Sequence, residues 1–531
     1  MKRLQFIILV LALLLPAASF AQGVISRGAA FSGASRIVRI QKPKSPKRAK
    51  QKSATTVSRD PLKLLTRKAN QGDTKSMYAL GLRYANGEGV AKDPAKAFEL
   101  YLKAAKKGYA PAQGAVGICY YEGEGVERDY YEAADWWEKG AAQGNDESQY
   151  GLCLAYFYGN GVYKNIEKAL TYSRHAAELG FVEAMITLGD IYADGLGVEE
   201  NDAEAYSWYK KAIAKDPKNE EALFAMGRCY VNGIGVARDE AEGLRWIQKS
   251  ADLGYPTALT TLGNAYVSGQ GVERDTAKAL GYYAKASDLG DGEAMYLLAT
   301  HYLTGDIVPK DEAKGIDYLT RAADSGFAQA QYQLGMYYAM GFKGENVSIE
   351  QNFNVAVNFS RLAAQQGLPE AQVLVSKLLF NGNAHQESNI PEAVKFLRMA
   401  EEQDYPEAYA CLGELYMQGI GVPQDYQKAK EYIEKSVEKE LPYGMMLLGQ
   451  VYCLGLGVPI DYPLAYHWLK KAVDNGIENA EVYFTLGSLA HPSFGINSDE
   501  NVCLGYLRKA VDMGSKNAEK ALEIYNSQGH F

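Results

Sequence analysis

The stretch GNAYVSGQGVERDTAKALGYYAKASDLG, residues 263–290, begins with a glycine in the middle of a helical pattern and continues to a Gly-x-Gly motif. Gly-x-Gly also begins the loops that bind the phosphates of dinucleotides. That fingerprint needs a strand before it and a third glycine that opens the next helix. The sequence offers neither, because the motif lies between two helical patterns. We therefore assign no nucleotide site, and the glycines need another explanation.

The pattern Leu-Gly-x-x-Tyr-x-x-Gly-x-Gly-Val recurs in twelve copies, most of them 36 residues apart. We call the place of its Leu-Gly glycine the repeat position; it falls at residues 81, 117, 153, 189, 227, 263, 299, 335, 376, 413, 449 and 487. A period of this size is typical of solenoids, in which each unit packs on its neighbours. The longer step of 41 residues, between 335 and 376, predicts a bend, a binding loop or a loop without a role.

Each copy predicts two helices. In the quoted copy, the apolar residues of the first helix recur at helical spacing and are Leu259, Leu262, Ala265 and Tyr266. The Gly269–Val272 segment is expected to end this helix, because glycine adopts the left-handed conformation that closes helices. Asp275 is suited to cap the second helix.

Glycine inside a helix costs about 1 kcal/mol relative to alanine, so its recurrence at the repeat position implies a compensating close approach. We predict that Gly263 lies against Ala286 of the second helix, where two helices cross. The residues that replace glycine in other copies, Cys153, Ala299 and Ser376, are also small.

The ends of the chain differ from the repeats. Residues 1–21 combine Lys2 and Arg3, an apolar run and a small-x-small motif, which predicts a secretory signal peptide. Residues 22–60 carry ten basic residues and one acidic residue and predict a disordered basic linker. Residues 516–531 predict a polar capping helix and tail, with Ala518, Ala521, Leu522 and Tyr525 on the last repeat.

The repeated part of the chain is acidic. Residues 61–531 hold 44 basic and 63 acidic residues, a formal net charge of −19. Nucleic acid binding is disfavoured, because contact with phosphates needs a positive surface. Weak contact with an anionic surface is left to the basic linker.

Over residues 61–515 the chain resembles the Sel-one-like repeats, a subclass of the tetratricopeptide-like helical repeats. The resemblance rests on the pattern A..LG..Y..G.GV..D...A..(W/Y)..KAA..G...A, as in residues 79–112. It implies an all-α fold, a right-handed superhelical solenoid of about twelve antiparallel helix pairs. It also implies a scaffold or adaptor that binds proteins, without a catalytic site or cofactor.

Some secreted members of this family carry paired cysteines about eight positions apart in each repeat, and this chain does not. Its cysteines are Cys119, Cys153, Cys229, Cys411, Cys453 and Cys503. Five of them fall in or beside the packed face of first helices, which favours buried free thiols. An even number in an exported protein leaves disulfides as the alternative.

Enzyme motifs are weak. Ser207 with Lys210, and Ser436 with Lys439, match the Ser-x-x-Lys motif of penicillin-recognising acylases, but the companion motifs are missing. The six histidines show no zinc-binding spacing, so we expect no metal. We therefore predict that the protein is not an enzyme.

The resemblance also implies where a partner binds. Residues one and five after the repeat position are four apart and share one face of the first helix. In the tetratricopeptide superfamily this face lines the concave groove. In the fourth to ninth copies the predicted partner-binding residues are Asp190, Asp194, Arg228, Asn232, Asn264, Ser268, Thr300, Thr304, Met336, Met340, Lys377 and Asn381.

Together these features predict an exported bacterial scaffold, periplasmic or secreted, that binds a protein or extended peptide in a concave groove. No transmembrane segment is expected, because the apolar run near the start is too short to span a bilayer. A cell-wall or β-lactam-processing hydrolase built on the same repeats is the alternative.

Overall fold

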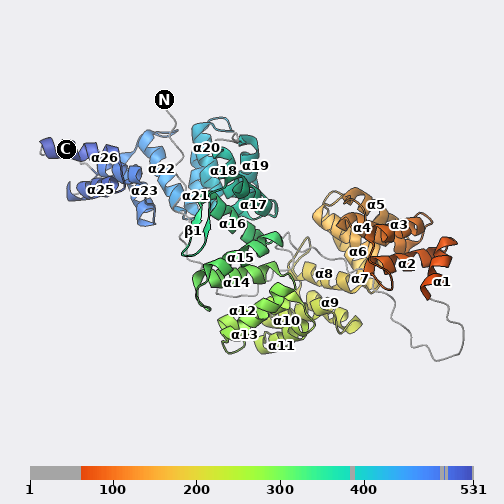
Figure 1. The fold of residues 1–531 in the computed structure, drawn as a ribbon. Helices are drawn as coiled ribbons and strands as arrows, with labels where there is room; N and C mark the ends of the chain where they lie inside the picture. Colours follow the sequence, from red (N-terminus) through yellow and green to blue (C-terminus); the bar gives the residue numbers. More distant parts are fainter. Residues whose placement is uncertain (1–60, 383–388, 491–495, 497–499, 529–531) are drawn as a thin grey trace. The chain divides into compact units, whose positions relative to one another are not determined.

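The computed structural model describes residues 61–382, 389–490, 496 and 500–528. The predicted signal peptide and basic linker lie outside these residues and stay predictions. The described residues up to 294 form one compact unit, the amino-terminal unit, and those from 295 onward form the carboxy-terminal unit. Figure 1 shows helices following one another as hairpins within each unit. None of the described helices is both long and apolar enough to cross a membrane.

Twelve helix pairs account for almost all of the described chain, which confirms an all-α repeat solenoid. The first helices of the pairs are α2 (Thr74–Asn86), α4 (Ala110–Glu122), α6 (Asp146–Tyr158), α8 (Val182–Ala193), α10 (Glu220–Asn232), α12 (Pro256–Ser268), α14 (Gly292–Thr304), α16 (Ala328–Met340), α18 (Pro369–Asn381), α20 (Pro406–Gln418), α22 (Pro442–Leu454) and α24 (Ala480–Leu489).

The second helices follow them in the chain. They are α3 (Pro94–Ala105), α5 (Tyr130–Ala141), α7 (Ile166–Glu178), α9 (Asp202–Lys215), α11 (Glu240–Asp252), α13 (Thr276–Asp288), α15 (Glu312–Asp324), α17 (Phe353–Gln365), α19 (Ile390–Glu401), α21 (Tyr426–Glu438), α23 (Tyr462–Asp474) and α25 (Glu500–Asp512). Two further helices lie outside the pairs, α1 (Pro61–Asn70) before the first and α26 (Lys516–Gln528) after the last.

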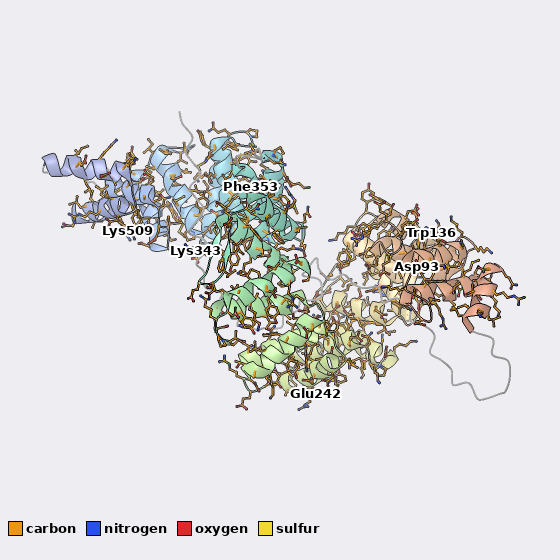
Figure 2. All side chains as sticks on the ribbon, in the orientation of Figure 1. Asp93, Trp136, Glu242, Lys343, Phe353 and Lys509 are labelled. Atoms are coloured by element: carbon orange, nitrogen blue, oxygen red, sulfur yellow. The ribbon has the colours of Figure 1, made fainter. Side chains whose placement is uncertain are left out.

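The helix boundaries follow the predicted capping residues. Helix α12 ends at Gly269, which has a left-handed φ of 78°. The Asp275 carboxylate caps α13 by accepting from the Lys278 amide at 2.9 Å. Asp93 caps α3 in the same way, with Pro94 as the first helical residue, and Figure 2 labels Asp93 beside that helix.

The repeat position lies where the second helix presses a side chain against the backbone of the first. A Cβ atom on Gly263 would overlap the ring of Tyr283. The same relation joins Gly117 to Trp137 and Gly227 to Ile247. Glycine therefore makes room for a large side chain, and this space compensates its unfavourable helix propensity.

The predicted partner of Gly263, Ala286, is wrong. Ala286 is buried in the same core cluster as Ala294, the start of the next first helix. At the equivalent places, Gly140 of α5 lies against Ser148 of α6. Small residues at the place of Ala286 and Gly140 thus let a second helix approach the first helix of the next repeat. Sequence spacing alone did not show which helix these residues contact.

Aromatic pairs join the two helices of several repeats outside this contact. The tyrosine three residues after the repeat position stacks on an aromatic residue of the second helix. Tyr266 and Tyr282 have ring centroids 5.7 Å apart and an interplanar angle of 11°. Tyr156 with Tyr172, Tyr302 with Tyr318 and Tyr416 with Tyr432 repeat the arrangement.

The irregular step between α16 and α17 contains a small hairpin, a departure from a purely helical chain. Strands β1 (Phe342–Lys343) and β2 (Ser348–Ile349) pair antiparallel. The Glu345 amide in the turn donates to the Glu312 carboxylate of α15 at 2.6 Å. The segment is therefore a hairpin held by a neighbouring repeat.

Helix α26 packs on α25 much as its sequence predicts. Ala518 is fully buried, and Ala521 and Leu522 pack against the same cluster as Leu507. The charged residues Lys516, Glu519, Lys520 and Glu523 are exposed. The side chain of Tyr525 lies outside the described part.

The repeat-position contact generates a prediction. Replacing Gly263 by alanine should destabilise the amino-terminal unit by about 1–3 kcal/mol, because the new methyl group has no room beside Tyr283. Urea unfolding followed by tryptophan fluorescence measures this, since four of the five tryptophans lie in that unit. In the double variant with Tyr283→Ser the two losses should not add.

A matched control lies in the same repeat. A Cβ atom on Gly281 of α13 would meet nothing within 4 Å. Gly281→Ala should therefore stabilise the unit by about 1 kcal/mol through helix propensity alone. Equal effects of the two glycine substitutions would contradict the packing explanation.

Candidate binding surface

One face of the first helices carries the predicted partner-binding residues. Residues six and three before the repeat position, and one and five after it, are spaced three or four apart and share this face. We call it the first-helix face. Adjacent first helices contact one another, as in α4 with α6 and α20 with α22. Residues of consecutive repeats therefore form rows on this face within each unit.

The first predicted pair of residues is buried rather than open. The Arg228 guanidinium lies 3.3 Å from the Asp190 carboxylate, with side-chain exposures of 3% and 6%. The Tyr209 hydroxyl donates to the same carboxylate oxygen at 2.7 Å. Asp190 and Arg228 thus bind each other between neighbouring repeats, and their predicted role in partner binding stays a prediction. Asp194 and Asn232, one turn further, are half-buried.

Of the next predicted residues, Asn264 is exposed and Ser268 is half-buried. The Asn264 amide oxygen accepts from the Tyr283 hydroxyl at 2.6 Å. The Ser268 hydroxyl donates to the Asn264 carbonyl at 2.9 Å. Asn264 retains an amide group toward solvent, so this repeat presents polar atoms on the face.

Hydroxyl and methionine side chains continue the prediction in the carboxy-terminal unit. Thr300 is half-buried and Thr304 exposed, and each hydroxyl donates to the carbonyl four residues earlier. Met336 is half-buried and Met340 is 37% exposed. The face is thus accessible here, and its binding role stays a prediction.

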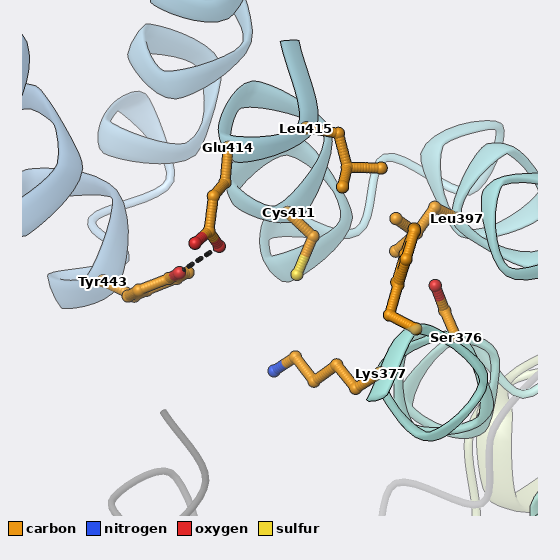
Figure 3. Close-up of a pocket in the computed structure, with 8 residues that line it drawn as sticks. Ser376, Lys377, Leu397, Cys411, Glu414, Leu415 and Tyr443 are labelled. Carbon is orange, nitrogen blue, oxygen red and sulfur yellow. Dashed lines mark hydrogen bonds between the residues drawn. The ribbon is translucent and has the colours of Figure 1, made fainter. Parts of the chain in front are cut away.

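The last predicted residues lie at a small cavity. Lys377 lines a space of about 20 Å³, and Asn381 is exposed one turn away. Figure 3 shows Lys377 reaching from α18 toward Glu414 and Tyr443. The Tyr443 hydroxyl donates to the Glu414 carboxylate at 2.6 Å.

Burial and three neighbouring side chains act on the pKa of Glu414 at this cavity. Burial raises the pKa of Glu414, while the hydrogen bonds from Tyr443 and Gln418 and the charge of Lys377 act in the opposite direction. A volume of this size holds about one water molecule. The role of Lys377 in partner binding stays a prediction.

The predicted partner-binding residues do not include a row of glutamates at the start of the first helices. It occupies the place six residues before the repeat position and comprises Glu147, Glu183, Glu221, Glu293, Glu370, Glu407 and Glu481. The recurrence of one acidic residue in seven copies was the signal that could have found it. Glutamate in the first turn also interacts favourably with the positive end of the helix.

Two glutamates of this row, Glu147 and Glu370, have a carboxylate oxygen that is buried and accepts no hydrogen bond from any described residue. Burial raises the pKa of Glu147 to about 7, and the carboxylates of Asp146 and Glu183 raise it further.

In one of the two Ser-x-x-Lys matches, the polar groups of Ser436 and Lys439 bond to other residues. Ser436 is fully buried, and its hydroxyl donates to the Ile433 carbonyl at 2.6 Å. The ammonium of Lys439 pairs with Asp404 instead. Ser207 is half-buried and Lys210 exposed on α9.

All six cysteines are free thiols in the structure. Cys119, Cys153, Cys229 and Cys503 are buried, while Cys411 and Cys453 are half-buried. Burial raises the pKa of Cys153 and of Cys229 to about 12. Over the described residues, no group of three or more His, Cys, Asp or Glu side chains is placed to hold a metal ion.

The fold and the repeats define the class of protein, an all-α repeat solenoid. The model of the Sel1 repeat family matches twelve consecutive segments, residues 74–109, 110–145, 146–181, 182–217, 220–255, 256–291, 292–327, 328–368, 369–405, 406–440, 442–477 and 481–515. The chain therefore belongs to the Sel1 repeat family.

Solved structures similar to this chain include a protective antigen of uropathogenic Escherichia coli with an SLR fold. It is 28% identical, with 88% of this chain and 98% of that chain covered and a TM-score of 0.47. A Sel1 repeat protein from Oxalobacter formigenes is 27% identical over 46% of this chain and 96% of that chain, with a TM-score of 0.41. No curated protein matches the chain.

The buried ion pair generates a prediction. Arg228→Leu should destabilise the amino-terminal unit by about 3–5 kcal/mol, because it leaves the Asp190 carboxylate buried without a cation. Asp190→Leu combined with Arg228→Leu should recover most of this loss. Urea unfolding measures both variants, and a double variant as unstable as Arg228→Leu would show that the pair is not the cause.

The Glu147 carboxylate generates another. Its folded pKa of about 7 lies above the ordinary value of 4.5, so the folded state holds the proton more tightly and stability falls as pH rises through this interval. Glu147→Gln should remove this loss and stabilise the unit by about 1–2 kcal/mol above pH 7. Melting curves of Glu147→Gln and the parent should show this gain in stability disappear toward pH 4.5. A gain that does not depend on pH would contradict the raised pKa as its cause.

Proposed function

We propose that this protein is an exported bacterial scaffold, periplasmic or secreted, that binds a protein segment along the first-helix face. Membership of the Sel1 repeat family supports an interaction scaffold. The signal-like residues 1–21 support export. The hydrolase alternative gains nothing from Ser436 and Lys439, whose polar groups bond elsewhere.

The observation that carries the proposal is the contrast between packed and open positions on the first helices. The repeat position and its Leu and Tyr neighbours are used by the helix pair, as Gly263, Leu262 and Tyr266 illustrate. Asn264, Thr304 and Met340 on the first-helix face stay exposed. Amide, hydroxyl and thioether groups can bond or pack against an extended backbone, and Met adapts to varied partners.

Site-specific photocrosslinking tests the proposal. A photoreactive amino acid at Thr304, on the first-helix face, should crosslink a partner in the native cell envelope. Thr320 on the second helix α15 is the matched control, because it is also exposed and its hydroxyl also donates to the carbonyl four residues earlier. Capture at both positions alike, or only at Thr320, would overturn the proposed surface.

A further inference from the structure

The first three repeats place aromatic rings and an unbalanced carboxylate close together on the first-helix face. Tyr78 of α2 packs against Tyr101 and Tyr109, with ring centroids 5.6 and 5.7 Å apart. Glu147 of α6 lies near enough for its charge to raise the pKa of Tyr78 and Tyr101, after the larger effect of burial. Glu147 of α6 thus interacts electrostatically with Tyr78 of α2, two first helices away.

Helix α4 lies between them and carries no side chain there. Gly114 occupies the place three residues before the repeat position, where α2 has Tyr78 and α6 has Tyr150. A Cβ atom on Gly114 would lie 3.5 Å from Glu147 Oε2. The missing side chain therefore leaves the carboxylate extended across α4 toward the aromatic residues.

Among the described residues, no cation forms an ion pair with Glu147. The charged side chains that act on it are Asp146 of its own helix and Glu183 of α8, both carboxylates. The phenols of Tyr78 of α2 and Tyr101 of α3 lie near enough for the charge of Glu147 to raise their pKa. A buried carboxylate oxygen without a donor costs free energy in the unbound protein, and a cationic ligand would remove that cost.

A carboxylate beside aromatic rings is the combination that binds arginine and lysine side chains. The carboxylate pairs with the cation, and the ring face attracts it through its quadrupole. Glu147 and Tyr78 are both half-buried, so each retains a side toward solvent. We propose that Glu147 and Tyr78 bind an arginine or lysine side chain from an extended segment of a partner protein.

The inference deepens the proposed function and rests on it for the nature of the partner. Its site, in the first three repeats, is separate from Asn264 and Thr304. Adjacent helices lie about 10 Å apart, and an extended chain advances about 3.3 Å per residue. A segment with a cation at every third residue would therefore present one cation to each successive first helix.

Fluorescence anisotropy with a defined peptide tests the inference. The probe is a labelled nonapeptide of three Arg-Gly-Ser units, and the neutral control peptide has citrulline for arginine. The full chain should bind the arginine peptide at low salt and bind the citrulline peptide at least tenfold more weakly. Glu147→Gln should weaken binding of the arginine peptide at least tenfold, and Tyr78→Ala should also weaken it.

The Glu147→Gln variant is expected to be more stable than the parent at neutral pH, so its loss of binding cannot come from unfolding. Glu138→Gln on α5 is the matched control, because Glu138 is exposed on a second helix of the same region and has the same charge. Equal losses from Glu138→Gln and Glu147→Gln would show attraction by net charge alone and overturn the site.

Carbodiimide crosslinking of the full chain distinguishes another occupant. A crosslink from Glu147 to a lysine of residues 22–60 would show that the basic segment of this chain occupies the site at Glu147 and Tyr78. It would overturn the proposal that a partner protein binds there. Binding that depends on Glu147, without capture at Thr304, would support this site while refuting the surface assigned under the proposed function. Capture of a partner at Thr304 without binding of the arginine peptide would support the surface assigned under the proposed function and overturn the site at Glu147.

Discussion

The contact between the repeat position and the second helix is the constraint on which each repeat depends. The first helix must expose bare backbone there, because a ring or branched side chain of the second helix occupies the space of the missing Cβ atom. Tyr283 fills it at Gly263, Trp137 at Gly117 and Ile247 at Gly227. Interiors pack as densely as crystals, so such a contact tolerates little change in volume. Where glycine is replaced by Cys153, the residue twenty positions later is Ser173 rather than a ring.

Two acidic residues of the first-helix face differ in whether their charge is paired within the protein. Asp190 is buried beside Arg228 from the next repeat and Tyr209 from its own, so its charge is paired inside the protein. Glu147 is surrounded by Asp146 and Glu183, and its Oε2 atom accepts no hydrogen bond from a described residue. Desolvation penalises both carboxylates, but only the first recovers the cost within the repeat array. The desolvation free energy of the Glu147 carboxylate is not offset within the protein, and a cation from a partner would offset it.

The local structure could be predicted from sequence because it depends on neighbours in the chain. Gly269 ends a helix and Asp275 begins one through backbone conformation and a hydrogen bond to the nearby Lys278 amide. The packing partner of Gly263 could not be predicted in this way. Tyr283 and Ala286 are three residues apart on one face of α13, and periodicity does not say which of them meets the first helix and which meets the next repeat. The candidate site suffered the same limit, since Arg228 and Asn264 occupy the same repeat place yet one is buried and the other exposed.

The sequence by itself determined the class of fold, the number of repeats and the ends of the helices, because these follow from periodicity and capping within a few residues. It also determined family membership, through a long pattern repeated twelve times. Only the tertiary structure decided which polar residues are buried and paired with other residues of the protein. Asp190 lies 38 positions before Arg228, and Glu147 extends over Gly114 from the following repeat. Whether such side chains find a partner depends on how neighbouring repeats stack, and burial and pairing across that stack have no signature in the residues of one repeat.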